Sequence, residues 1–279
     1  MIVDFHTHIF PDNMAAAVVE KLSIDGGILP YCDGTEQGLL QSMQKSGISH
    51  SVVLPVATNP NKVSSVNRAA VLEKQDGSII HFGAMHPDCP DWKQELHTLS
   101  AHGCKGIKLH PVYQGVDLDD IRYLRIIDEA AALGMTVVTH TGDDIGFPGV
   151  VHCSPAMALN VLKTLGAVRL VLAHMGGWNC WEEARELLSG QNVFIDTSFS
   201  AGTAKRRPDA ENRGKVRMLS EQSFCELVRT FGAEHVLFGT DSPWSDQKKS
   251  VDFIKNSGLN STETDAILFK NALKLLNIE

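Results

Sequence analysis

The chain has 279 residues, of which 43% are hydrophobic and 21% are charged, a composition typical of a globular protein with a large core. Its net charge of −8 and its sequence pI of about 5.8 argue against nucleic acid and anionic membranes as partners, because both favour a basic surface. The opening residues, MIVDFHTH, lack the basic and apolar segments of a signal peptide. No apolar run approaches the roughly 20 residues of a membrane span, so we expect a cytoplasmic protein.

Short apolar runs rich in Val, Ile and Leu recur along the chain without apolar–polar alternation, which is typical of buried parallel strands. Eight such strands are predicted: Ile2–Phe5, Ile48–Leu54, Ile79–Ala84, Gly106–Leu109, Met135–Thr139, Arg169–Ala173, Val193–Asp196 and Val236–Gly239. Apolar residues at helical spacing between and after them predict helices: Asp119–Leu133, Ala156–Leu165, Glu182–Leu188, Glu221–Phe231 and Thr262–Leu276.

Eight strands alternating with helices predict an α/β fold, a single-domain (β/α)8 TIM barrel spanning residues 1–279 with a parallel barrel and outer helices. A doubly wound open sheet is the alternative. One polar, basic stretch, Ser200–Val216, is predicted to be a long loop after the seventh strand, which in a barrel overhangs the active-site face. The six cysteines include no C-x-x-C pair, so we expect free thiols.

Polar side chains follow five of the predicted strands at the point where each strand ends: His6 and His8, Lys108 and His110, His140, His174, and Asp241. Because the carboxyl ends of the strands of a parallel barrel meet at one face, we expect these residues to converge. Imidazole and carboxylate groups suit Zn²⁺ and related divalent ions, which lower the pKa of bound water to about 7. Asp241 is a candidate acceptor for the proton of that water.

Several motifs, in this order and spacing, resemble the amidohydrolase superfamily, and in particular its amidohydrolase-2 branch, which includes the aminocarboxymuconate-semialdehyde decarboxylase-like enzymes. They are DFHTHIFP, KGIKLHP, VVTHTG, LAHMGGW, NVFIDTS, VLFGTDSPW and ILFKNALKLLNI, and they cover nearly the whole chain. The resemblance implies metal-dependent hydrolysis of amides, esters or lactones, or non-oxidative decarboxylation.

The resemblance also implies roles for individual residues. Metal ligands would be His6, His8, His140 and Asp241, and catalytic groups would be Asp241 and His174. Either His174 is the catalytic histidine beside one metal, or it binds a second metal. Two further residues, Lys108 and His110, are candidates for a second metal or for substrate. Lys108 is either a carboxylated bridge between two metals, an ammonium that binds a substrate carboxylate, or a residue that faces away.

Other residues are assigned more loosely. Asp4 is either structural or orients a ligand histidine, while Asp196 and Ser198 either face the pocket or cap it. Candidate substrate-binding residues are Arg206, Arg207, Trp178 and Trp244. The arginines lie in the basic loop and favour an anionic small molecule as substrate.

The sequence is compatible with three functions. The first is a hydrolase of a small, carboxylated substrate, the second is a decarboxylase of an aromatic or unsaturated acid, and the third is a metal- or metabolite-binding barrel without turnover. We favour the hydrolase. The expected cofactor is one or two divalent ions, Zn²⁺ before Mn²⁺, and relatives suggest a homodimer.

Overall fold

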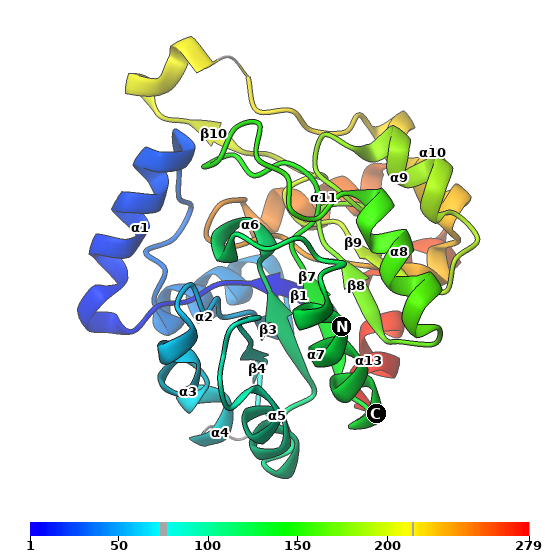
Figure 1. Cartoon of the computed structure of the whole chain (residues 1–279). Helices are drawn as coiled ribbons and strands as arrows, with labels where there is room; N and C mark the ends of the chain where they lie inside the picture. The colour runs from blue at the N-terminus through cyan, green and yellow to red at the C-terminus, as the bar shows by residue number, and fades with distance from the viewer. Residues whose placement is uncertain (73–76, 214, 279) are drawn as a thin grey trace. The chain divides into compact units, whose positions relative to one another are not determined.

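The computed structural model of the chain describes residues 1–72, 77–213 and 215–278 (Figure 1). The chain forms two compact units. Unit 1 comprises Met1–Ser51, Asp144–Gly149 and Asp196–Glu279, and unit 2 comprises Val52–Asp143 and Val150–Ile195. Within the described ranges, no helix is long and apolar enough to cross a membrane.

Unit 2 contains a parallel sheet in which neighbours in space are also neighbours in sequence. Its strands are β5 (Gly83–Ala84), β6 (Gly106–Leu109), β7 (Thr136–Thr139), β8 (Leu170–Leu172) and β9 (Phe194–Asp196), the last of which ends in unit 1. All residues of β6, β7 and β8 are buried. That burial explains their unbroken apolar pattern, since a sheet covered on both faces has no solvent side.

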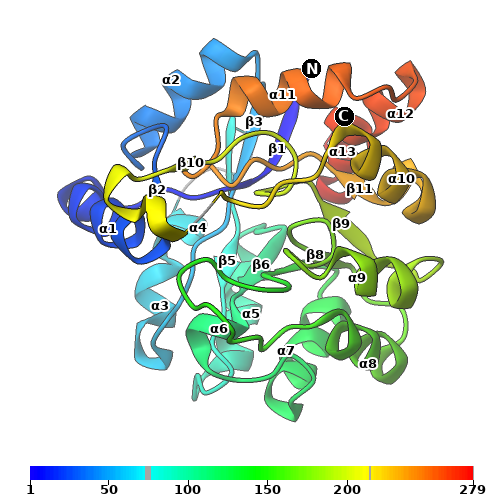
Figure 2. The same cartoon turned by 90° about the horizontal axis from the view of Figure 1, so that it is seen from above.

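Helices lie on the outer side of this sheet, where α5 (Trp92–Ala101) packs against α7 (Ile121–Ala132), α7 against α8 (Pro155–Leu165), and α8 against α9 (Trp181–Leu188) (Figure 2). The helical segments of unit 2 are η1 (Pro60–Lys62), α3 (Val63–Val66), α4 (Arg68–Leu72), α5 (Trp92–Ala101), α6 (Pro111–Gln114), α7 (Ile121–Ala132), α8 (Pro155–Leu165) and α9 (Trp181–Leu188). Side-chain caps begin three of them: Asn59 accepts a hydrogen bond at the start of η1, Asp120 at the start of α7 and Ser154 at the start of α8. β3 (His50–Val53) leads into this unit, where Val53 accepts a hydrogen bond from Phe82, next to β4 (Ile79–His81).

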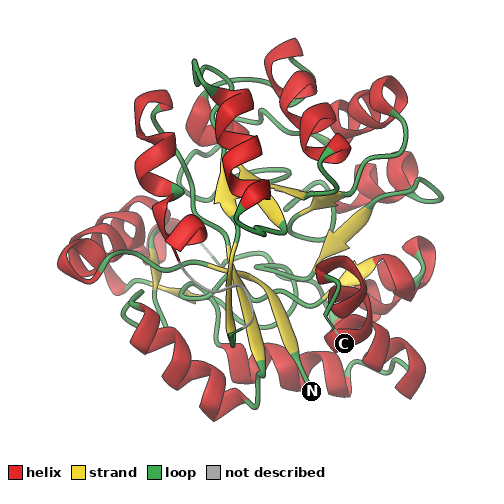
Figure 3. Cartoon of the chain, turned by 90° about the horizontal axis from the view of Figure 1, so that it is seen from below, coloured by secondary structure: helices red, strands yellow, loops and turns green. Residues whose placement is uncertain are grey.

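Unit 1 is built from both ends of the chain. Its first strand, β1 (Val3–Thr7), runs beside β11 (Val236–Leu237), and Phe5 N donates to Phe238 O over 2.7 Å. Its helical segments are α1 (Asp12–Gly26), α2 (Glu36–Ser46), η2 (Pro208–Arg213), α10 (Glu221–Phe231), η3 (Ala233–His235), α11 (Gln247–Asn256), α12 (Ser261–Asp265), η4 (Ala266–Lys270) and α13 (Asn271–Leu276). α13 packs against β1, and the two chain ends lie close together in Figure 3.

The stretch Ser200–Val216, predicted as a loop, contains regular structure. β10 (Lys205–Arg206) pairs antiparallel with β2 (Ile28–Leu29), and η2 follows directly. Arg207 binds Glu20 and Asp209 at its guanidinium, and Arg213 donates to the carbonyl of Asp25. Since Glu20 and Asp25 lie on α1, the arginines fasten the stretch to that helix.

The α/β class predicted from the sequence is confirmed, and both β6 and α10 have the predicted bounds. Other segments differ from the prediction. The run Ile79–Ala84 is divided into β4 and β5, and Thr262–Leu276 consists of α12, the π-helical η4 and α13. The prediction did not include the α-helices α1, α2, α3, α4, α5, α6 and α11 of the described residues.

Candidate functional site

At the carboxyl end of β1, two histidines meet one carboxylate in unit 1. His8 Nε2 lies 3.0 Å from Asp241 Oδ1, and His6 Nε2 lies 3.5 Å from the same oxygen. The two imidazole rings are edge to face with centroids 5.1 Å apart. The sequence argument that His6 and His8 point the same way is thereby consistent with the geometry. We call these three residues the ligand cluster.

The main chain holds the ligand cluster together. Asp241 N donates to His6 O over 2.8 Å, and His8 N donates to Ser242 O over 2.7 Å. Asp241 has φ +63°, a left-handed conformation that costs a non-glycine residue roughly 1–3 kcal/mol. The pairing of the two segments therefore fixes the carboxylate where the two imidazoles can share it.

The donor set fits a divalent metal ion. One ligand atom each from His6, His8 and Asp241 lies within 4.8 Å of the others, and His6 is almost fully buried. Two imidazoles and a carboxylate are a donor set typical of catalytic Zn²⁺ and of related first-row ions.

Two buried carboxylates surround His6, and each contacts a different part of it. Asp196 Oδ2 lies 2.8 Å from Nδ1 of the imidazole, whereas Asp4 Oδ1 accepts from the main-chain N of His6 over 3.3 Å. Asp4 also accepts from Thr240 N over 2.9 Å and from Gln247 Nε2 over 2.7 Å. Burial raises the pKa of Asp4 to about 7. The hydrogen bonds from Thr240 and Gln247 lower this pKa, but the effect of burial is larger.

Unit 2 gathers three of the predicted histidines, His110, His140 and His174, which we call the histidine cluster. His110 stacks on His140 with centroids 4.4 Å apart and an angle of 14° between the planes. His174 Nε2 lies 3.0 Å from His140 Nδ1, and His140 Nε2 lies 3.1 Å from the carbonyl of Asp143. A carbonyl only accepts, so the contact with Asp143 requires a proton on His140 Nε2, and a neutral His140 then accepts from His174 at Nδ1. Metal binding by His140 would require it to give up one of these hydrogen bonds.

Close backbone packing at the end of β7 supports the histidine cluster. Gly142 has φ +86°, and a Cβ there would lie 2.4 Å from both N and O of Trp178. Trp178 N donates to Thr141 O, and Trp178 O accepts from Asp143 N. Glycine is therefore required where the segment after His140 meets the segment after His174.

Lys108 is almost fully buried, with 1% of its surface exposed, and it pairs with Ala84 and Val138 in the sheet. A lysine is rarely so buried unless its ammonium is paired or chemically modified. His110 follows two positions later, where its main-chain N donates to Gln114 Oε1. Both residues therefore line the interior of unit 2 beside β6.

The predicted substrate-binding residues have protein partners. Arg206 donates to Gly26 O over 3.0 Å, and burial lowers its pKa. Arg207 is 3.1 Å from Glu20 and 3.0 Å from Asp209, so a substrate carboxylate would compete with both. Trp178 and Trp244 are nearly buried, and Trp244 N donates to Asp241 O. Substrate binding by these four residues stays a prediction.

Two glutamines that hold the site were not predicted. Gln114, at the end of α6, donates to Ala57 O and Met85 O, each over 2.7 Å, and accepts from His110 N and the Tyr123 hydroxyl. Gln247 donates to Asp4 from the start of α11. Their partners are far away in the sequence, so no local pattern could have identified them.

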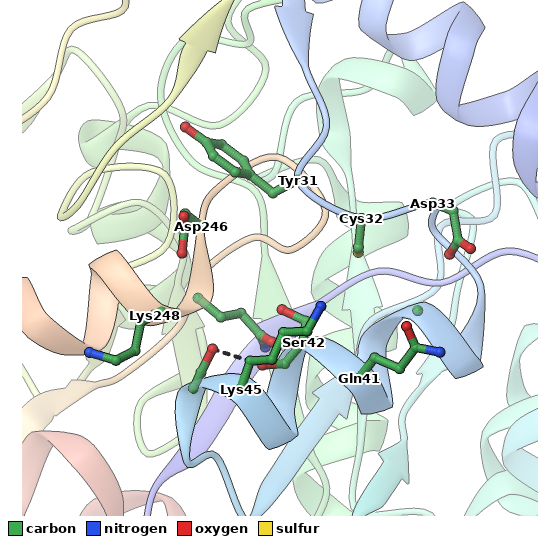
Figure 4. A pocket seen from close by; sticks show the side chains of 11 residues that line it. Tyr31, Cys32, Asp33, Gln41, Ser42, Lys45, Asp246 and Lys248 are labelled. Atoms are coloured by element: carbon green, nitrogen blue, oxygen red, sulfur yellow. Dashed lines mark hydrogen bonds between the residues drawn. The ribbon is translucent and has the colours of Figure 1, made fainter.

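Unit 1 also has an open hollow of about 380 Å³ (Figure 4). It borders the segment after Asp241, because Tyr31 N donates to Pro243 O and Cys32 Sγ lies 3.6 Å from Ser242 Oγ. The lining residues include Tyr31, Cys32, Asp33, Gln41, Lys45, Asp246, Gln247 and Lys248. Charges of both signs line it, so its composition favours no particular ligand.

Comparisons with known proteins agree on the fold. An uncharacterized Tim-barrel protein from Bordetella bronchiseptica is 17% identical, with a TM-score of 0.73 and 99% of this chain and 98% of that chain covered. A putative 2-pyrone-4,6-dicarboxylic acid hydrolase from Pseudomonas putida is 18% identical (TM-score 0.65; 100% and 98% covered). A dihydroxybenzoic acid decarboxylase from Polaromonas, solved with bound manganese and an inhibitor, is 15% identical (TM-score 0.68; 99% and 96% covered). The predicted barrel fold is confirmed.

No curated protein sequence matches the chain. The sequence profile of one family, described as amidohydrolase, matches residues 3–278 and thus nearly the full length. That span includes both the ligand cluster and the histidine cluster. The chain belongs to the amidohydrolase-2 family.

Proposed function

We propose that this chain is a metal-dependent hydrolase that cleaves an amide, ester or lactone bond in a small carboxylated substrate. The observation that carries the proposal is the ligand cluster, in which Nε2 of His6 and Nε2 of His8 face Asp241 Oδ1 at 3.5 and 3.0 Å. A divalent ion bound there would polarise a substrate carbonyl and lower the pKa of a water molecule to about 7.

Asp241 is proposed to have two functions. Its Oδ1 faces the two imidazoles, and a carboxylate has lone pairs on both oxygens, so Oδ2 can accept the proton of an attacking water. The left-handed conformation and the hydrogen bond from Asp241 N to His6 O fix the carboxylate for this transfer. Such preorganisation reduces the reorientation required during reaction.

The histidine cluster is proposed to bind and protonate the substrate in the same reaction. The family match over residues 3–278 supports this, because it includes both clusters. His140 is proposed as a further metal ligand. His174, 3.0 Å from His140, would hold the proton that the leaving group takes. Lys108 and His110 are proposed to bind a substrate carboxylate or a second ion.

The metal content of the purified protein, measured by elemental analysis without added metal, tests the cofactor. The donor set favours zinc, and manganese is the alternative. About one equivalent would support the ligand cluster with His174 acting as acid–base, and about two would support a carboxylated Lys108 as a bridge. Protein that contains no metal and takes none up on reconstitution would refute the proposal.

A decarboxylase is the second candidate, and the His140–His174 pair favours it. Loss of a carboxyl group as CO₂ leaves a carbanion that takes up a proton, and a histidine hydrogen-bonded to a second histidine can deliver one. The substrate would be an aromatic or unsaturated acid.

Product analysis separates the two reactions. The metal-loaded protein would be incubated with 2-pyrone-4,6-dicarboxylate, a lactone, and with 2,6-dihydroxybenzoate, an aromatic acid, and the products identified by mass spectrometry. Ring opening with uptake of water supports the hydrolase, whereas CO₂ release supports the decarboxylase. The variant Asp241→Asn serves as the control in both assays, since either reaction should lose most of its rate without this carboxylate.

A further inference from the structure

The side chain of Asp196, at the end of β9, contacts the imidazole of His6 on the side away from Asp241. Asp196 Oδ2 lies 2.8 Å from His6 Nδ1, and the two side chains are 0% and 1% exposed. His6 Nε2, the other ring nitrogen, is the atom near Asp241. The imidazole is thus bounded by one carboxylate at each nitrogen.

We propose that Asp196 is a positioning residue that fixes the tautomer of His6, so that Nδ1 carries the proton and Nε2 is the metal-binding atom. The inference rests on the proposed metal site. An ionised carboxylate only accepts hydrogen bonds, so a neutral His6 facing Asp196 must donate from Nδ1. The lone pair is then on Nε2, because a neutral imidazole has one protonated nitrogen.

Ser198 orients the Asp196 carboxylate for this contact. The main-chain N of Ser198 donates to Asp196 Oδ1 over 3.0 Å, and its hydroxyl donates to the same oxygen. These donors engage Oδ1 and turn Oδ2 towards the imidazole. Ser198 Oγ also lies 3.0 Å from His6 Nδ1, where its lone pair can accept part of the same N–H.

Gly239 provides the space in which the three side chains meet. A Cβ at Gly239 would lie 2.8 Å from His6 Cβ, 3.4 Å from Ser198 Cβ and 3.5 Å from Asp196 Cγ. Any larger residue would push the His6 imidazole away from its present place. The arrangement is therefore a packed contact, in which Asp196 has little freedom to turn away.

Asp4 provides the matched control. It is also a fully buried carboxylate next to His6, but it accepts from the main-chain N of His6 and from Thr240 and Gln247. It holds the backbone of β1 and of the Asp241 segment, whereas Asp196 contacts the ring. The same change, Asp to Asn, can thus be made at both positions.

The first measurement is zinc affinity by competition with a chromophoric chelator, for the wild type, Asp196→Asn and Asp4→Asn. Loss of a carboxylate that orients a ligand histidine weakens metal binding by roughly 10- to 100-fold. We expect a loss of that size for Asp196→Asn and a smaller one for Asp4→Asn, whose effect should be mainly on the melting temperature. Equal zinc affinity in Asp196→Asn and the wild type would overturn the inference and leave the proposed function standing.

The second measurement is long-range ¹H–¹⁵N correlation NMR of zinc-loaded protein labelled at histidine, with His6 assigned by loss of its signals in His6→Gln. The expected wild-type result is a zinc-shifted Nε2 and an Nδ1 proton at the downfield shift of an N–H donated to a carboxylate. Because zinc at Nε2 alone leaves Nδ1 protonated, the signature of Asp196 is the upfield shift of that proton in Asp196→Asn. A proton on Nε2 of His6 would overturn the inference even if Asp196→Asn failed to fold. A wild type that binds no zinc would instead refute the proposed metal site itself.

Discussion

Gln114 makes four buried hydrogen bonds and provides a quantitative test of how unit 2 is held together. Its amide joins Ala57 and Met85, which follow β3 and β5, to His110 and Tyr123. Burial raises the pKa of Tyr123 well above its ordinary value, so its hydroxyl remains a donor. The substitution Gln114→Leu keeps nearly the same volume and removes all four hydrogen bonds.

The expected loss of stability follows from counting these bonds. Each intramolecular hydrogen bond contributes a net 0.5–1.5 kcal/mol or so, and the four together about 2–6 kcal/mol. The partners stay buried and lose their bonds, which favours the upper half of that range. Urea unfolding of the metal-free protein, followed by tryptophan fluorescence, measures the change through the midpoint and slope.

Tyr123→Phe removes one of the four hydrogen bonds and is the matched control. It should cost about 1 kcal/mol, and the double variant should cost less than the sum of the two single variants because they share that bond. A loss below about 1 kcal/mol for Gln114→Leu would contradict the reasoning, since it would mean that water replaces the amide at every partner.

Three further outcomes are expected. His8→Ala should lower the zinc bound per protein chain, measured by elemental analysis after dialysis, while the circular dichroism spectrum is retained; unchanged zinc content would remove His8 from the ligand cluster. Gly142→Ala should cost at least about 2 kcal/mol in urea unfolding, because the residue has positive φ and its Cβ would clash with the backbone of Trp178; a stable variant would contradict the close approach. Burial raises the pKa of Cys153 to about 12, so at pH 8 iodoacetamide should label the half-buried Cys32 and Cys180 before Cys153, as mass spectrometry of peptides would show; early labelling of Cys153 would contradict its burial.

Local patterns were sufficient to predict the buried parallel strands and several helices of this chain. The run Gly106–Leu109 forms β6 as predicted. A parallel strand buried on both faces consists largely of consecutive apolar residues, and this pattern is visible in the sequence. The bounds of α10 were also predicted correctly, from apolar residues at helical spacing. The β2–β10 ribbon was missed, since two residues on each strand are too few to establish a period.

The site could be predicted only in part for a related reason. Alternation along β1 placed His6 and His8 on one side, and the barrel argument suggested Asp241 as their partner. The contact between Asp196 and His6 joins residues 190 positions apart. From the sequence alone, Asp196 could either face the pocket or cap it. Left-handed conformations at His174 and Asp241 depend on the surrounding packing, and neither is a glycine.

The chain order of unit 1 has a consequence for synthesis. His8 is made among the first residues, but its partner Asp241 lies 233 positions later. At the usual elongation rate, about 10–50 s separate the two on the ribosome. By the time Asp241 is made, all of unit 2 has been synthesised, whereas until then β1 lacks the segment after β11 to which Phe5 and His8 donate hydrogen bonds. We therefore expect metal to be acquired after release of the finished polypeptide, with unit 1 assembling last.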